Sequence, residues 1–188
     1  FLLSERDFRS VIPDVSEMLL KNLSGRSVLL YGLVHDGGRN LLRLDFAESL
    51  RGSGLAPYSL ATGQGLAGRI AESGTDYFSP ALDDEALAGD GDLAPFARGQ
   101  ACFGFPLVTR EHLQSVLLFL FDPDVKLPPR ELLSAIAHLI ANYLGTVQLR
   151  RDLFRTRKKF SLLNNYKKVF SCTLDLRPVL SVFMNITA

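Results

Sequence analysis

The stretch of sequence that decides the fold is residues 61–74, ATGQGLAGRIAESG. It predicts a sharp turn followed by a short helix over Gly65 to Glu72, which Ser73-Gly74 ends. The first two glycines let the chain turn into the helix, and Gly68 lets that helix lie close against a sheet. The glycine spacing also matches a dinucleotide-binding fingerprint, but the stretch follows a loop rather than a strand, which argues against that alternative.

The sequence before this stretch predicts a helix and a hairpin. Apolar residues at helical spacing in residues 8–23 predict an amphipathic first helix, which starts late or bends because of Pro13. The continuous apolar run 28–34 and the alternating residues 42–46 predict two strands joined by a glycine turn. No period survives over residues 47–60, which is typical of a loop.

The sequence after it predicts three strands interrupted by an acidic segment. The strands are expected over residues 76–79, 102–109 and 113–121. The acidic segment between the first two is expected to be a flap with one helical turn; its acidic residues are Asp83, Asp84, Glu85, Asp90 and Asp92.

A long helix is predicted after Pro129, with proline and glutamate in its first turn. Its apolar stripe continues beyond the expected domain, and such a stripe needs a partner. We therefore predict a homodimer through the first and last helices, to which the last helix contributes Ile136, Leu139, Tyr143, Val147, Leu153 and Phe160.

The charge distribution predicts where the domain ends. Residues 1–149 hold 12 Lys and Arg against 18 Asp and Glu, and residues 150–188 hold 9 against 2. We expect a domain over residues 1–149, then a basic linker helix and the start of a following module over residues 150–188. Such a basic run can meet nucleic acid or an anionic membrane surface. No nucleic-acid motif accompanies it, so a solvated helix face is favoured.

The order of the predicted elements indicates an α+β fold. An antiparallel sheet would carry the terminal helices on one face and the loops and flap on the other. Residues 61–74 resemble the signature turn and helix of the GAF domain family, whose fold is of this GAF/PAS-like kind. Residues 103–108, FGFPLV, resemble its proline-containing fifth strand, and residues 128–149 are similar to its closing helix. The resemblance covers about residues 8–149, and residues 170–176 look like the lead-in to a second such module.

Composition restricts the class of protein further. With 47% hydrophobic and 22% charged residues, the 188-residue chain has the composition of a globular protein. Its longest apolar runs are far shorter than the ~20 residues of a membrane-spanning helix, so we expect no membrane segment. Cys102 and Cys172 cannot supply a four-cysteine metal or iron–sulfur site, and they favour a cytoplasmic setting. Because the chain begins with Phe1, we expect it to be a piece of a longer protein.

The resemblance implies a regulatory sensor with a small molecule or redox centre between sheet and flap, but the family's ligand motifs are not matched. Asp84-Glu85 comes before Phe96, whereas the acidic pair of cyclic-nucleotide-binding members follows the phenylalanine. Neither cysteine is followed by histidine, as in bilin-binding members. His35, His112 and His138 are placed poorly for haem, and the flap lacks the late glutamate of a calcium loop. The family's methionine sulfoxide reduction needs several cysteines, and only Cys102 lies in the core.

An apolar ligand pocket would draw on the aromatic residues of sheet and flap. The candidates are Tyr31, Phe46, Tyr58, Phe78, Phe96, Phe103 and Phe105. The alternative, that these side chains simply fill the core, stays open because alternate strand positions must be apolar in any such sheet.

We expect a sensor module of a multidomain signal-transduction protein, with an unknown small ligand and a downstream output domain in the same chain. One alternative is a GAF-fold dimerisation or spacer module without a ligand. A cleft enzyme is a second alternative, but no Ser-His-Asp set or recognisable pair of catalytic carboxylates appears, so no catalytic residue is predicted.

Overall fold

The structure, a computed structural model, describes residues 13, 16–17, 19–49, 55, 57–109 and 112–173. The chain divides into two units, Phe1–Gly145 and Thr146–Ala188. The first is built on a β-sheet, and the second contains the later part of the last helix. The division lies four residues before the boundary expected from the charge distribution, 145 against 149.

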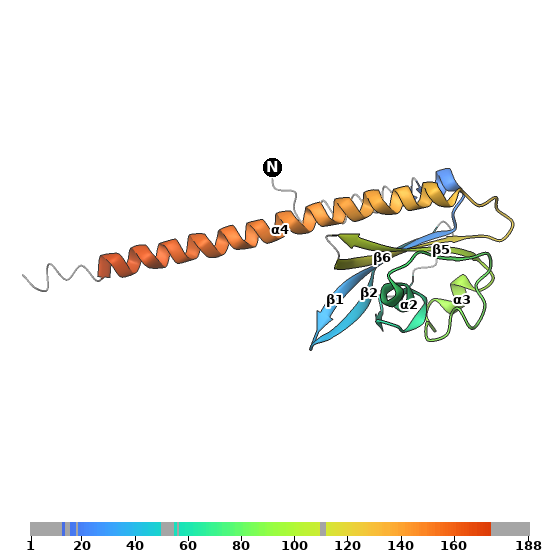
Figure 1. The fold of residues 1–188 in the computed structure, drawn as a ribbon, viewed down its shortest axis with the longest axis horizontal. Helices are drawn as coiled ribbons and strands as arrows, with labels where there is room; N and C mark the ends of the chain where they lie inside the picture. Colours follow the sequence, from blue (N-terminus) through green and yellow to red (C-terminus); the bar gives the residue numbers. More distant parts are fainter. Residues whose placement is uncertain are drawn as a thin grey trace, which may run out of the picture. The chain divides into compact units, whose positions relative to one another are not determined.

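Six strands form one sheet, in which every neighbouring pair is antiparallel. Their order across the sheet is β3-β2-β1-β6-β5-β4. Figure 1 labels β1, β2, β5 and β6. The strands are β1 (Ser27–Asp36), β2 (Arg39–Ser49), β3 (Ser59–Ala61), β4 (Tyr77–Ser79), β5 (Ala101–Thr109) and β6 (His112–Phe121). The antiparallel α+β prediction is therefore confirmed.

The described helices are α2 (Gly65–Ser73), α3 (Ala94–Ala97) and α4 (Arg130–Thr173). Residues 13, 16, 17 and 19–23 are also helical, within the predicted first helix. The prediction of a loop over residues 47–60 is wrong at both ends, because β2 continues to Ser49 and β3 begins at Ser59. Three-residue β3 is too short for a periodic pattern, and it exists through its pairing with residues 41–43 of β2.

The sheet has an apolar core on each face. On one, which we call the helix face, strand residues pack with Leu19 and Leu20 and with three residues of α4, Leu133, Ala137 and Ala141. On the other, the flap face, they pack with α2 and with the flap, residues 80–100. Figure 1 shows the part of α4 that belongs to the first unit along one side of β5 and β6, with α2 and α3 on the opposite side. The flap face is where a ligand site was expected.

A bulge between β1 and β2 changes which residues face the flap. Tyr31 pairs with Leu44, whereas its neighbour Leu30 pairs with Phe46, so Asp45 is an extra residue in β2. Leu44 therefore packs on the flap face and Phe46 on the helix face. Regular alternation would have put both on one face.

Helix α4 is more apolar than the sequence analysis expected. An 18-residue window within Arg130–Leu163 has a mean hydropathy of 1.3, enough by length and composition for a membrane span. The search for continuous apolar runs did not find this window, because polar residues interrupt its apolar residues along the sequence. Only 17% of that window is buried, so core packing accounts for part of its apolar surface and leaves the rest exposed.

Candidate functional site

The turn that leads into α2 has the geometry that its glycines predicted. Gly63 and Gly65 have φ angles of 87° and 65°, which side chains other than glycine rarely adopt. A Cβ on Gly68 would lie 2.5 Å from the carbonyl oxygen of Ala61, so α2 packs on β3 at a distance that only glycine permits. The predicted sharp turn and close helix are confirmed, and they position the wall of a cleft.

A cleft of about 400 Å³ lies between α2, β4 and the flap. Apolar side chains form part of its wall, and hydroxyl and charged groups form the rest. Its lining residues are Leu66, Arg69, Ile70, Ser73, Thr75, Asp76, Tyr77, Asp83, Glu85 and Ala86. The volume falls in the range of about 300–1,000 Å³ that is typical of small-molecule sites.

Polar contacts hold the flap against α2. The guanidinium of Arg69 donates to the carbonyl oxygen of Glu85 at 3.3 Å, and also to that of Ala86. Two further contacts lie within the flap itself: Asp83 accepts from the backbone N–H of Ala86 at 2.7 Å, and Asp84 pairs with Arg98 at 2.5 Å. A change at Arg69 therefore acts directly on the flap.

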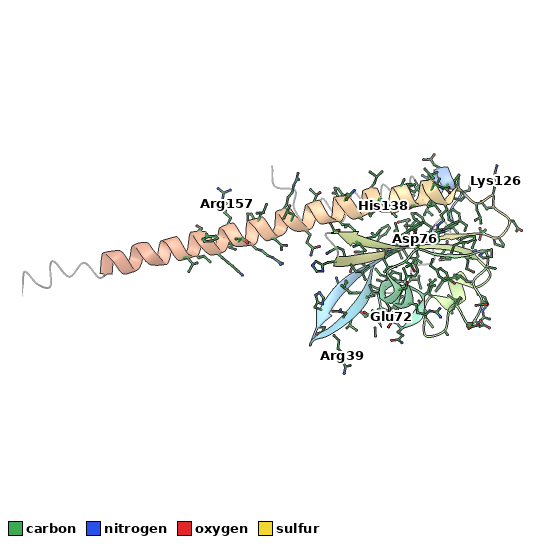
Figure 2. The ribbon with its side chains drawn as sticks, viewed as in Figure 1. Arg39, Glu72, Asp76, Lys126, His138 and Arg157 are labelled. Atoms are coloured by element: carbon green, nitrogen blue, oxygen red, sulfur yellow. The ribbon has the colours of Figure 1, made fainter. Side chains whose placement is uncertain are left out.

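Asp76 connects the cleft to α4. It lines the cleft, and its carboxylate pairs with Arg130, the first residue of α4, at 3.3 Å. It also lines a smaller hollow of about 220 Å³, bordered by β5 and by Ala137, His138 and Ala141 of α4. Figure 2 labels Asp76 and His138.

A buried polar chain lies on the same face as the cleft but outside its lining. The hydroxyls of Tyr31 and Tyr58 are 2.6 Å apart, and that of Tyr58 donates to Asp90 Oδ1 at 2.9 Å. Asp90 is 1% exposed, and within the described residues its Oδ2 atom has no hydrogen bond of standard geometry. Burial raises the pKa of Asp90. Hydrogen bonds from Tyr58 and from the backbone N–H groups of Leu66 and Leu93 act in the opposite direction on that pKa.

The seven predicted pocket residues do not line one pocket. Tyr31 and Tyr58 lie together on the flap face, with their rings 6.0 Å apart, and Phe96 is half-buried in α3. Phe46, Phe103 and Phe105 pack on the helix face, and the exposed Phe78 lies against Phe103 at 4.5 Å between ring centroids. The prediction of a shared aromatic lining is corrected, because strand alternation and the β2 bulge send these side chains to opposite faces.

The six residues predicted to form the dimer helix also differ in their exposure. Leu139 is 69% exposed, and Leu153 and Phe160 are exposed to a similar degree. Ile136 packs on the helix-face core, while Tyr143 and Val147 are half-buried. The exposed apolar residues of α4 are Leu132, Leu139, Leu149, Leu153, Phe154, Phe160, Leu162 and Leu163.

Groups that often carry redox or metal chemistry are dispersed in the described residues. Cys102 is fully buried, and burial raises the pKa of its thiol, the reverse of a nucleophile's setting. His35, His112 and His138 are exposed on three different elements. Within the described part of the chain, no three His, Cys, Asp or Glu side chains gather as a metal site would require.

Comparisons with solved structures establish the fold. The second GAF domain of DevS from Mycobacterium smegmatis matches with a TM-score of 0.57 and 13% identity, over 77% of this chain and 98% of that chain. A GAF domain/HD domain protein from Geobacter sulfurreducens matches with a TM-score of 0.55 and 16% identity, over 74% and 93%. NreA from Staphylococcus aureus, mutated in its nitrate-binding site, matches with a TM-score of 0.54 and 16% identity, over 67% and 94%.

These likenesses show that the chain has the GAF fold, as residues 61–74 predicted. No protein-family model matches the sequence, and no curated protein matches it significantly.

Sequence reasoning missed the residues that form the cleft and the buried chain. Arg69 lay within the quoted stretch, but nothing in the pattern showed that it reaches the flap. Asp90 looked like its neighbour Asp92, yet the structure buries the first and exposes the second. No sequence signal separates the two, because the difference arises from contacts with segments distant in the chain.

Proposed function

We propose that this chain is a regulatory sensor module, rather than an enzyme, of a multidomain signal-transduction protein. A small ligand binds in the cleft between α2, β4 and the flap, and α4 carries the response to an output domain. The observation that supports this most directly is a cleft of about 400 Å³ that the flap borders, where the guanidinium of Arg69 contacts the flap backbone. The fold adds support, since one solved neighbour has a nitrate-binding site and another combines GAF and HD domains.

The contacts suggest how the signal leaves the cleft. A ligand that approaches Arg69 competes for the donors that now hold the Glu85 and Ala86 carbonyls, and so changes the position of the flap. A ligand that contacts Asp76 changes its ion pair with Arg130 at the start of α4. Differential binding of this kind is what a ligand needs in order to shift a conformational equilibrium.

Native mass spectrometry of the purified chain tests this function. We expect additional non-protein mass on the wild type, and its loss from Arg69→Ala, because that variant removes the one cationic side chain among the described residues that line the cleft. The matched control is Arg39→Ala in the β1–β2 hairpin, an exposed arginine labelled in Figure 2, which should keep the mass. Bare wild-type protein with unchanged melting in nucleotides, amino acids, carboxylates and nitrate would contradict ligand binding and favour the spacer module.

We also propose that the module is a homodimer through α4. In the second unit, Leu149, Leu153, Phe160 and Leu163 are exposed and stand at a and d positions of a heptad pattern, in which Thr156 takes the position between Leu153 and Phe160. Asp152 and Arg157, five residues apart, flank the seam with opposite charges, an arrangement that favours parallel pairing with a second copy.

The double substitution Leu153→Glu and Phe160→Glu is expected to weaken this dimer more than a hundredfold. Each buried apolar side chain contributes roughly 1.5–3 kcal/mol, and about 1.4 kcal/mol is tenfold in affinity. Light scattering coupled to size exclusion measures the mass. Phe154→Glu with Leu162→Glu, equally exposed but off the seam, is the control and should remain dimeric. Equal dimerisation of both double variants would contradict pairing through this seam.

A further inference from the structure

The N-terminus of α2 lacks a cap of its own. The residue in the N-cap position, Gln64, makes no side-chain capping bond in the described structure, and the first turn contains no acidic residue. The first backbone N–H groups of a helix need acceptors, and the positive end of the helix dipole favours an anion there. Such an end is a potential anion site when another group points to it.

Asp90 of the flap supplies that group, from 25 residues beyond the start of α2. A Cβ on Gly65, the first residue of α2, would lie 3.0 Å from Asp90 Oδ2. Burial raises the pKa of this carboxyl, and the N–H of Leu66 in the same turn acts in the opposite direction. The carboxylate is almost completely buried, and Tyr58 holds its other oxygen. The side chain is thus enclosed between the start of α2, the segment before β3 and the flap.

We infer that the N-terminus of α2 is an anion-binding site that the protein fills with its own Asp90 carboxylate, and that it accepts a small free carboxylate when this side chain is absent. Asp90 acts as an internal ligand that fastens the flap to α2. The hydroxyl of Tyr58 donates to the second carboxylate oxygen. The site therefore fits a small planar anion rather than a bulky one. This site is separate from the proposed cleft, whose lining does not include Asp90.

Rescue of Asp90→Ala by sodium formate tests the inference. The variant deletes the carboxylate and leaves room for formate, which has the same planar group. We expect roughly tenfold faster amide exchange over residues 84–99 of this variant than of the wild type. This corresponds to the loss of stability that is typical when a helix cap is removed. Added formate should restore protection and the melting temperature in a saturable way, relative to equal sodium chloride. Wild type and Asp92→Ala, which changes an exposed flap carboxylate, should not respond.

Two outcomes would overturn the inference. One is a folded Asp90→Ala protein that formate does not protect, and the other is an equal response of Asp92→Ala, which would reveal a general salt effect. Asp90→Asn is a second variant that keeps the volume filled, so it should fold and remain insensitive to formate. If Asp90→Ala folds only with an anion present, refolding in formate but not in chloride supports the site, and failure in both contradicts it.

Discussion

Gly68→Ala is expected to destabilise the domain by about 2–3 kcal/mol, in the upper part of the range for overpacked sites. Alanine alone would favour the helix by about 1 kcal/mol over glycine. Here, however, its Cβ would stand 2.5 Å from the carbonyl oxygen of Ala61 and 3.2 Å from the backbone nitrogen of Gly63. Both are backbone atoms, so no side-chain rotation relieves the contact, and α2 must move away from β3. Urea unfolding at neutral pH measures the loss.

Gly91→Ala is the matched control for this prediction. No atom lies within 4 Å of a Cβ placed on Gly91, and its backbone angles suit other residues. Its stability should stay within about 0.5 kcal/mol of the wild type, as for most surface substitutions. If Gly68→Ala matches Gly91→Ala, the packing of α2 on β3 is looser than the structure shows.

Local patterns in the sequence were sufficient to predict most of the fold. Residues 61–74 contain a turn, a helix and a close contact, and the glycines that the turn and the contact need lie within six residues of one another, at positions 63, 65 and 68. The hairpin and the last two strands show apolar runs bounded by turns. These patterns predicted that all four strands exist, and they nearly predicted the ends of β5 and β6, whereas β2 extends beyond its predicted range at both ends. Each of these features is determined by neighbours in the sequence, and that is why sequence reasoning reached them.

The candidate site could not be predicted in the same way, because it is determined by contacts between distant segments. The extra residue in β2, Asp45, is visible only in the register with β1, and it moves Phe46 to the helix face. The burial of Asp90 depends on Tyr58 and on the start of α2, which lie 32 and 25 residues earlier in the chain. A sequence pattern shows that a residue is aromatic or acidic, but it does not show on which face of the sheet the side chain lies.

Asp90→Asn is expected to change how the stability of the domain depends on pH. Burial raises the pKa of Asp90 in the folded state, whereas the unfolded chain keeps a value of about 4. Between these two values the folded protein binds more protons than the unfolded chain. The contribution of Asp90 to the free energy of unfolding therefore falls as pH rises through this range, and becomes constant above the folded-state pKa. Asparagine cannot titrate, so in the variant this fall disappears.

The groups around Asp90 do not obscure its contribution to the pH dependence of the free energy of unfolding. Burial raises the pKa values of Tyr31 and Tyr58, so both phenols stay neutral across the acidic range. Asp92→Asn is the control. The charge of Asp92 also raises the pKa of Asp90, but by less than burial does, so this variant should keep most of the wild-type slope. Urea unfolding between pH 4.5 and 7.5 should show Asp90→Asn gaining stability relative to wild type as pH rises, and then levelling off. Parallel curves for the two proteins would mean that Asp90 titrates alike in the folded and unfolded states, and that its carboxyl is not buried in solution.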